Sequence, residues 1–177
     1  MGLLLVYGCS QGEEVVEPPA PETSAKLMRD KAAILQVQRA FLDDIAGVGD
    51  KWDAYELSLR ADLSEYAAGR LDALDEVIST PKGKLIKEKF LELLKKHHET
   101  ASNWIDTLAG LREVEERLRQ FKEEGEGANA GSVEERTARQ IELLKEKRDI
   151  QGRLTGKEQA DIMNIEHEIV ELFKTYK

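Results

Sequence analysis

Cysteine and proline are both scarce in this chain, and no stretch of it stays apolar for long. The single cysteine cannot form an intramolecular disulfide, so no disulfide framework supports the fold. No apolar run reaches the ~20 residues that a membrane-spanning helix requires. Basic residues are in deficit, since 26 lysines and arginines stand against 35 aspartates and glutamates and leave a net charge of −9. That balance argues against non-specific binding to nucleic acid, which needs a basic surface.

Motifs of common enzyme chemistry are also absent. The sequence contains no phosphate-binding glycine loop, no nucleophile elbow, no Cys-x-x-Cys pair and no zinc-binding His-Glu-x-x-His. Its many carboxylates are scattered on solvated helix faces, and their number alone does not make an acid–base pair. We therefore predict that the protein is not an enzyme and has no cofactor.

What the sequence does have is helical periodicity, most clearly from Pro81 to Glu124. Charged residues make up 34% of the chain and hydrophobic residues 41%, which is typical of long, well-solvated helices. The apolar positions of this stretch recur in steps of three and four, as one face of a helix requires. They are Phe90, Leu94, His97, Ala101, Trp104, Leu108, Leu111, Val114, Leu118 and Phe121. The pattern predicts a single helix of about 65 Å, whose apolar face needs partners from the rest of the chain.

Glycines at 47 and 49 leave the number of helices open. If Gly47–Gly49 is only a kink, three rods of comparable length result, over 25–79, 82–124 and 132–177. If it is a reversal, Asp50 caps a separate second helix and the bundle has four unequal helices. The matched lengths favour three rods. Both alternatives are all-α and predict an elongated antiparallel bundle of long, coiled-coil-like helices.

The last third of the chain has its own start and break signals. The glycine-rich stretch 125–131 cannot continue the long helix. Ser132, with Glu135 three residues later, forms a capping box that opens the last helix. Thr155–Gly156 interrupts the pattern, so we expect a kink or a short break at that point.

The beginning of the chain carries the clearest functional clue. Val6-Tyr7-Gly8-Cys9 resembles the lipobox of bacterial lipoproteins, in which a small residue precedes a cysteine. The resemblance implies that residues 1–8 are a truncated lipoprotein-type signal and that Cys9 becomes the lipid-modified first residue. Several acyl chains on one residue make a stable membrane anchor. The resemblance therefore implies a protein anchored by lipid in a bacterial cell envelope, at the outer membrane or on its periplasmic side.

Residues 9–24 have the composition of a tether. They are acidic, contain three prolines and lack a helical period, which is typical of an extended or flexible linker. A tether between a lipid anchor and a folded domain has this composition. We therefore expect a helical-bundle domain over 25–177.

The charge is unevenly distributed along the predicted helices. Ten acidic and three basic residues lie between positions 43 and 76. A lysine-rich stretch follows, with Lys82, Lys84, Lys87, Lys89, Lys95 and Lys96. One interpretation is that neighbouring antiparallel helices pair these charges across a solvated seam, where each pair contributes little. The other is a basic patch for an anionic partner, which the four-helix topology would bring to the anchored end and to lipid headgroups.

His97, Trp104 and His167 are the candidates for a ligand or metal site. His97 and Trp104 share the inner face of the long helix, whereas His167 belongs to the last predicted helix. Adjacent helical residues diverge by about 100°, so His97 and His98 cannot easily share one ion. We expect His97 to be a half-buried histidine with a hydrogen-bond partner and Trp104 to be a core residue.

These features together predict a non-enzymatic module that binds or scaffolds another protein of the envelope. Apolar edges left over on long helices also make a homodimer a candidate. One alternative is a periplasmic carrier that holds a small ligand or a metal inside the bundle. The other is a cytosolic coiled-coil interaction protein in which Cys9 is unmodified. No nucleic-acid partner is expected.

Overall fold

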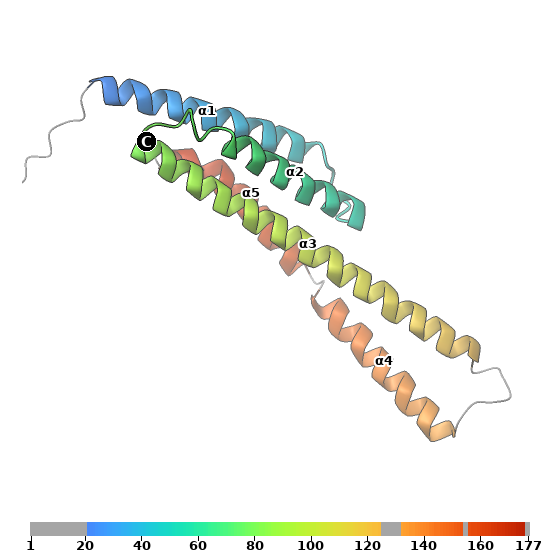
Figure 1. The fold of residues 1–177 in the computed structure, drawn as a ribbon. Helices are drawn as coiled ribbons and strands as arrows, with labels where there is room; N and C mark the ends of the chain where they lie inside the picture. The colour runs from blue at the N-terminus through green and yellow to red at the C-terminus, as the bar shows by residue number, and fades with distance from the viewer. Residues whose placement is uncertain (1–20, 125–131, 154–155, 176–177) are drawn as a thin grey trace, which may run out of the picture.

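The computed structural model describes residues 21–124, 132–153 and 156–175, and in these ranges all regular structure is helical. The five helices are α1 (Pro21–Ala46), α2 (Ala54–Asp72), α3 (Pro81–Glu124), α4 (Val133–Arg153) and α5 (Lys157–Thr175). Helices α1, α2, α3 and α5 pack together, and α4 packs against the second half of α3 (Figure 1). We call the four-helix part the body, and residues 106–124 with α4 the arm. The predicted all-α, elongated bundle is confirmed.

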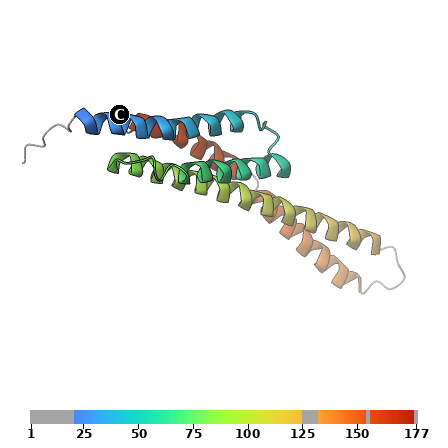
Figure 2. The same cartoon turned by 45° about the horizontal axis from the view of Figure 1, so that its top comes forward.

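The chain reverses between α1 and α2, so the three-rod alternative is wrong. Gly49 has a φ of +100° and Trp52 has a φ of +54°, both in the left-handed region. Two left-handed residues so close together turn the backbone back on itself, where a kink would only have bent it. The four-helix alternative is therefore the observed one, with α2 running back along α1 (Figures 1 and 2).

Helix α2 is shorter than predicted and presents a different face to the core. Its N-cap is Asp53, whose Oδ1 accepts hydrogen bonds from the backbone N–H groups of Tyr55 and Glu56, at 3.0 and 2.9 Å. Asp50 is therefore not the cap. Tyr55 and Tyr66, which the periodicity places on the inner face, are 72% and 62% exposed. The apolar side chains that α2 does bury are two leucines and two alanines: Leu57, Ala61, Ala67 and Leu71.

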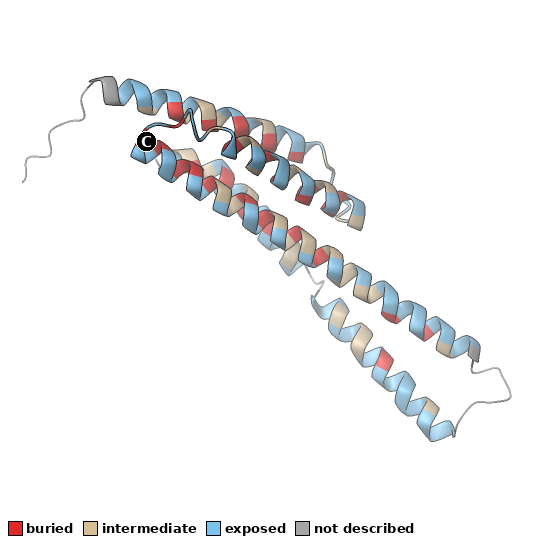
Figure 3. Cartoon of the chain, in the orientation of Figure 1, coloured by how far each residue is buried: buried red, intermediate tan, exposed pale blue. Residues whose placement is uncertain are grey.

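The inner face of α3 is confirmed along its whole length. Seven of its predicted positions are buried: Phe90, Leu94, His97, Ala101, Trp104, Val114 and Leu118. In Figure 3 the buried positions recur along one side of α3, whereas α4 is almost entirely exposed. The face is shared, because its first part packs against α1, α2 and α5 and its last part packs against α4.

The start of α3 is held by a buried carboxylate of α1. Asp30 is completely buried and accepts hydrogen bonds from the backbone N–H of Thr80 at 2.8 Å and from its hydroxyl at 2.6 Å. The backbone N–H of Ser79 is also within 3.2 Å of the carboxylate. The hydroxyl oxygen of Thr80 in turn accepts from the N–H of Gly83, as an N-cap side chain does. A carboxylate at this position also interacts favourably with the dipole of α3.

Helices α4 and α5 begin and end near the predicted positions. Glu135 and Ser132 form the predicted capping box, in which each side chain accepts from the other's backbone N–H at 3.2 Å. The predicted break is also present, since α4 ends at Arg153, α5 begins at Lys157, and Gly156 between them has a φ of +83°. Thr155 lies outside the described residues.

Candidate functional sites

His97 lies where all four helices of the body meet. It is completely buried, and not half-buried as predicted. Its Nδ1 is 2.7 Å from the hydroxyl oxygen of Ser64 on α2, and its Nε2 is 3.2 Å from a carboxylate oxygen of Glu166 on α5. The ring of Phe41 on α1 meets the imidazole edge-on, with centroids 5.6 Å apart. The expected hydrogen-bond partner is therefore present, and both ring nitrogens are engaged.

The contact with Glu166 requires that Nε2 of His97 carries a proton. A carboxylate only accepts hydrogen bonds, so the imidazole must be the donor. The Ser64 hydroxyl donates to Nδ1 when that nitrogen is bare. When Nδ1 carries a proton, the hydroxyl accepts it and donates to the carbonyl of Arg60, 2.9 Å away. The same contacts thus suit neutral and protonated His97, and neither ring nitrogen is directed at open space.

Arg60 connects this histidine cluster to the turn between α1 and α2. Its Nη1 lies 2.5 Å from Glu166, and its Nη2 donates to the carbonyl of Gly49 at 2.9 Å. The guanidinium also lies 4.2 Å from the centre of the Trp52 ring. An arginine that is only 4% exposed needs such partners, because an unpaired buried charge is strongly destabilising. The cluster therefore joins α2, α5 and the turn, which is a structural role.

Trp104 stacks against Trp52 in the same region. The two rings are nearly parallel, at 16°, and their centroids are 5.5 Å apart. Around them lie the buried Leu57 of α2, Ala101 of α3 and Ile162 of α5. This packing agrees with the core role expected of Trp104.

His167 does not join His97 and Trp104. It is exposed on α5, whereas the two other candidates are buried in the body. Among the described residues, no group of three or more histidine, cysteine, aspartate or glutamate side chains is arranged to hold a metal ion. The three residues are therefore not brought together as one site.

The lysine-rich start of α3 divides into two kinds of position. Lys87 is only 6% exposed, and its ammonium contacts Asp75 and lies 3.6 Å from Asp72. This is the charge pairing between neighbouring helices that the sequence suggested. Lys89 pairs along its own helix with Glu92 at 2.8 Å. Lys82, Lys84, Lys89, Lys95 and Lys96 are the members of the predicted patch that remain exposed.

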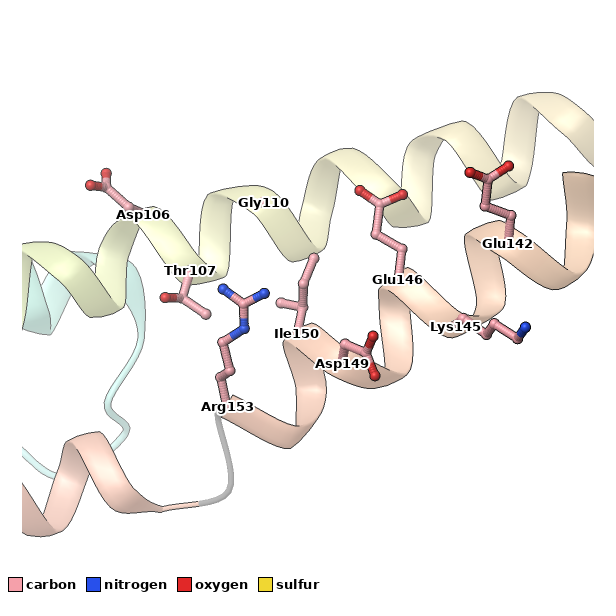
Figure 4. Close-up of a pocket in the computed structure, with 9 residues that line it drawn as sticks. All are labelled: Asp106, Thr107, Gly110, Glu142, Lys145, Glu146, Asp149, Ile150 and Arg153. Carbon is pink, nitrogen blue, oxygen red and sulfur yellow. The ribbon is translucent and has the colours of Figure 1, made fainter.

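A groove of about 610 Å³ runs between α3 and α4 in the arm (Figure 4). On the α3 side it is bordered by Asp106, Thr107 and Gly110, and on the α4 side Ile150 points towards α3 and Arg153 towards Thr107. The charged residues of its lining are four acidic side chains and two basic ones: Asp106, Glu142, Glu146, Asp149, Lys145 and Arg153.

The other side of α4 carries exposed apolar residues. Ile141 and Leu144, which the periodicity predicts as inner positions, are 47% and 49% exposed, and Val133 is 80% exposed. Leu143 is instead the residue of α4 that is buried against α3, at 3% exposed, and Ile150 is partly buried beside it. At about 100° per residue, Val133, Thr137, Ile141 and Leu144 fall within an arc of about 80° on the helix surface. We call these four residues the outer stripe.

Sequence reasoning missed the buried polar side chains that hold the body together. Asp30, Gln38 and Arg60 are each less than 5% exposed, and the amide nitrogen of Gln38 donates to the carbonyl of Ile169 on α5. A signal was available for Asp30, because it falls between Leu27 and Ile34 on the apolar stripe of α1. Polar residues in such positions are buried only when they have partners.

The described residues define an all-α protein with a four-helix body and a two-helix arm. None of their helices has the length and apolar content needed to cross a bilayer. Cys9, with the rest of the lipobox-like motif, lies outside the described residues. Comparison with known proteins found no matching family model, no matching curated protein and no matching solved structure.

Proposed function

We propose that the protein is a non-enzymatic interaction module of a bacterial cell envelope, held at the membrane by lipid on Cys9. The observation that carries the proposal is the outer stripe of α4, in which Val133, Ile141 and Leu144 are substantially exposed. A contiguous apolar surface with a polar rim is typical of a site that binds another protein. All four residues of the outer stripe are uncharged, whereas charged residues make up 34% of the chain.

The arrangement of the helices supports a membrane anchor ahead of α1. The start of α1 and the tip of the arm lie at opposite ends of the molecule (Figures 1 and 2). A chain anchored at Cys9 would therefore present the arm away from the membrane. Asp30 holds the start of α3 beside α1, which brings the exposed Lys82 and Lys84 to the anchored end. Anionic lipid headgroups would attract lysines at that end.

The anchor is tested by mass and location. The protein is expressed from its native gene with the upstream sequence retained, and its membrane fraction is examined by intact mass spectrometry. We expect a product that begins at Cys9 and carries acyl mass, and we expect Cys9→Ser to release the protein from the membrane. An unmodified cysteine in the wild-type product would overturn the anchor.

The interaction surface is tested by photo-crosslinking in the anchored protein. A photoreactive amino acid replaces Leu144 in the outer stripe or, as a matched control, the exposed Glu65 on α2. We expect a discrete adduct from position 144 and none from position 65. If position 144 gives no discrete adduct, the outer stripe is not a protein-binding surface and the proposal fails.

A further inference from the structure

We infer that the outer stripe of α4 binds the outer stripe of a second copy of this chain, with the two α4 helices antiparallel. The inference rests on the proposed function, because it names the partner of the same surface. Four observations support it: the small core of the arm, the position of the apolar residues, the order of the charges along the stripe, and the charge balance of the arm.

The arm buries too little apolar surface to be self-sufficient. Its core consists of Val114, Leu118 and Leu143, with Phe121 and Ile150 partly buried beside them. The remaining contacts between α3 and α4 include two ion pairs at the surface, and such pairs contribute little. Two helices with three buried side chains between them are marginal in water, because most helical stability comes from tertiary packing. A second arm against α4 would supply that packing.

The outer stripe has the spacing of a helix–helix seam. Ile141 and Leu144 are three residues apart, and Thr137 and Arg148 extend the same side by one turn in each direction. If a twofold axis passes between Ile141 and Leu144, each Ile141 faces Leu144 of the partner subunit. Both residues are about half exposed in one copy, and this pairing would cover them.

The charges at the two ends of the stripe favour the antiparallel arrangement. Glu134 lies at its N-terminal end and Arg148 at its C-terminal end, and both side chains are exposed. Antiparallel pairing places Glu134 within reach of Arg148 of the partner subunit, twice in each dimer. Parallel pairing would place like charges together, which is unfavourable.

The arm also has the charge balance that self-association needs. Residues 106–124 and 132–153 contain eleven acidic and ten basic side chains. Most of the net charge of −9 therefore lies elsewhere in the chain. Two copies that meet through their arms avoid the repulsion that two strongly acidic surfaces would suffer.

The contact is small, so the isolated dimer should be weak. Helix α4 has 21 residues and is about 32 Å long, which gives an interface at the low end of the range for specific complexes. Self-association is thus expected to be reversible in solution.

The first test is site-specific crosslinking of the full chain in a Cys9→Ser background, so that each variant contains only the cysteine introduced for the test. Ile141→Cys lies in the outer stripe, and Glu142→Cys lies on the opposite side of the same helix, beside the groove. A short thiol-reactive crosslinker should join two chains through Ile141→Cys and not through Glu142→Cys. Equal yields from the two positions, or no product from either, would overturn the inference.

The second test is a charge exchange followed by sedimentation equilibrium. Glu134→Arg should weaken the dimer about tenfold, because two attractive contacts become repulsive. Adding Arg148→Glu should restore the affinity, and Glu142→Arg should leave it unchanged. A protein that stays monomeric at every concentration, while position 144 still gives an adduct with a different protein, refutes self-association and leaves the interaction module standing.

Discussion

Two glycines of α3 should respond in opposite ways to replacement by alanine. A Cβ added at Gly83 would lie 2.5 Å from a carboxylate oxygen of Asp30 and 2.9 Å from the hydroxyl oxygen of Thr80. Asp30 cannot move away cheaply, because it is completely buried and bonded to three donors at the start of α3. A Cβ added at Gly110 would meet no heavy atom within 4 Å.

The expected magnitudes follow from these distances. Replacing glycine by alanine inside a helix stabilises by about 1 kcal/mol. At Gly83 this gain is outweighed by overpacking, at about 1–3 kcal/mol, and by loss of a charge-assisted hydrogen bond to Asp30, at about 1.5–3 kcal/mol. We therefore expect Gly83→Ala to destabilise the body by about 1.5–5 kcal/mol and Gly110→Ala to stabilise α3 by about 0.5–1 kcal/mol.

Urea denaturation provides the assay, with tryptophan fluorescence reporting on the body and far-ultraviolet circular dichroism on all helices. Both tryptophans belong to one cluster that is formed mainly by the body, so their signal reports mainly on the body. A double-mutant cycle with Asp30→Ala checks the cause, since the cost of Gly83→Ala should shrink once the carboxylate is gone. If Gly83→Ala is as stable as the wild type, the close approach of α1 to the start of α3 is wrong.

Three further predictions concern single side chains. Asp30→Ala should lower the free energy of unfolding by about 3 kcal/mol, because it leaves buried donors without their acceptor. In the same assay, Asp43→Ala at an exposed position of the same helix should change the free energy of unfolding by less than ~0.5 kcal/mol. Nitrogen-15 NMR should find a proton on Nε2 of His97, and a proton on Nδ1 alone would contradict the contact of Nε2 with Glu166. Hydrogen bonding to Arg119 lowers the pKa of the Glu116 carboxyl below 4.5. This pair therefore stabilises the arm above pH 4.5, and it stabilises the arm less as the pH falls below that value. Arg119→Gln should move the titration midpoint of the Glu116 carboxyl carbon, followed by carbon-13 NMR, back towards 4.5.

Hydrophobic periodicity was sufficient to predict a helix and its buried side where the helix has one apolar face made of large side chains. The long helix over 81–124 is observed as predicted, and Phe90, Leu94 and Leu118 are buried on its inner face. The capping box at Ser132 was also predictable, because its hydrogen bonds connect residues three positions apart. Contacts this local are fixed by the sequence around them.

Periodicity failed where a helix has two competing faces. In α2, Tyr55 and Tyr66 contribute more to a hydrophobic pattern than the alanines do, so the pattern places the tyrosines inside. Ala61 and Ala67 face the core instead, because small side chains let the helices approach closely. In α4 the stripe through Leu143 and the stripe through Ile141 and Leu144 are similarly apolar. The tertiary structure decides which one meets α3, and nothing local to α4 distinguishes them.

The two parts of the molecule are held by different kinds of contact, and this difference bears on what each part does. In the body, the buried polar side chains Asp30, Arg60 and His97 bond across helices, and each contact suits only one arrangement of the chain. Such contacts specify a unique structure, because any other packing would leave a buried polar group without a partner. The arm lacks polar contacts of this kind among its described residues and relies on three buried apolar side chains and surface ion pairs. A body held by buried polar contacts that carries a weakly packed arm suits the proposed module, whose binding surface would be completed by its partner.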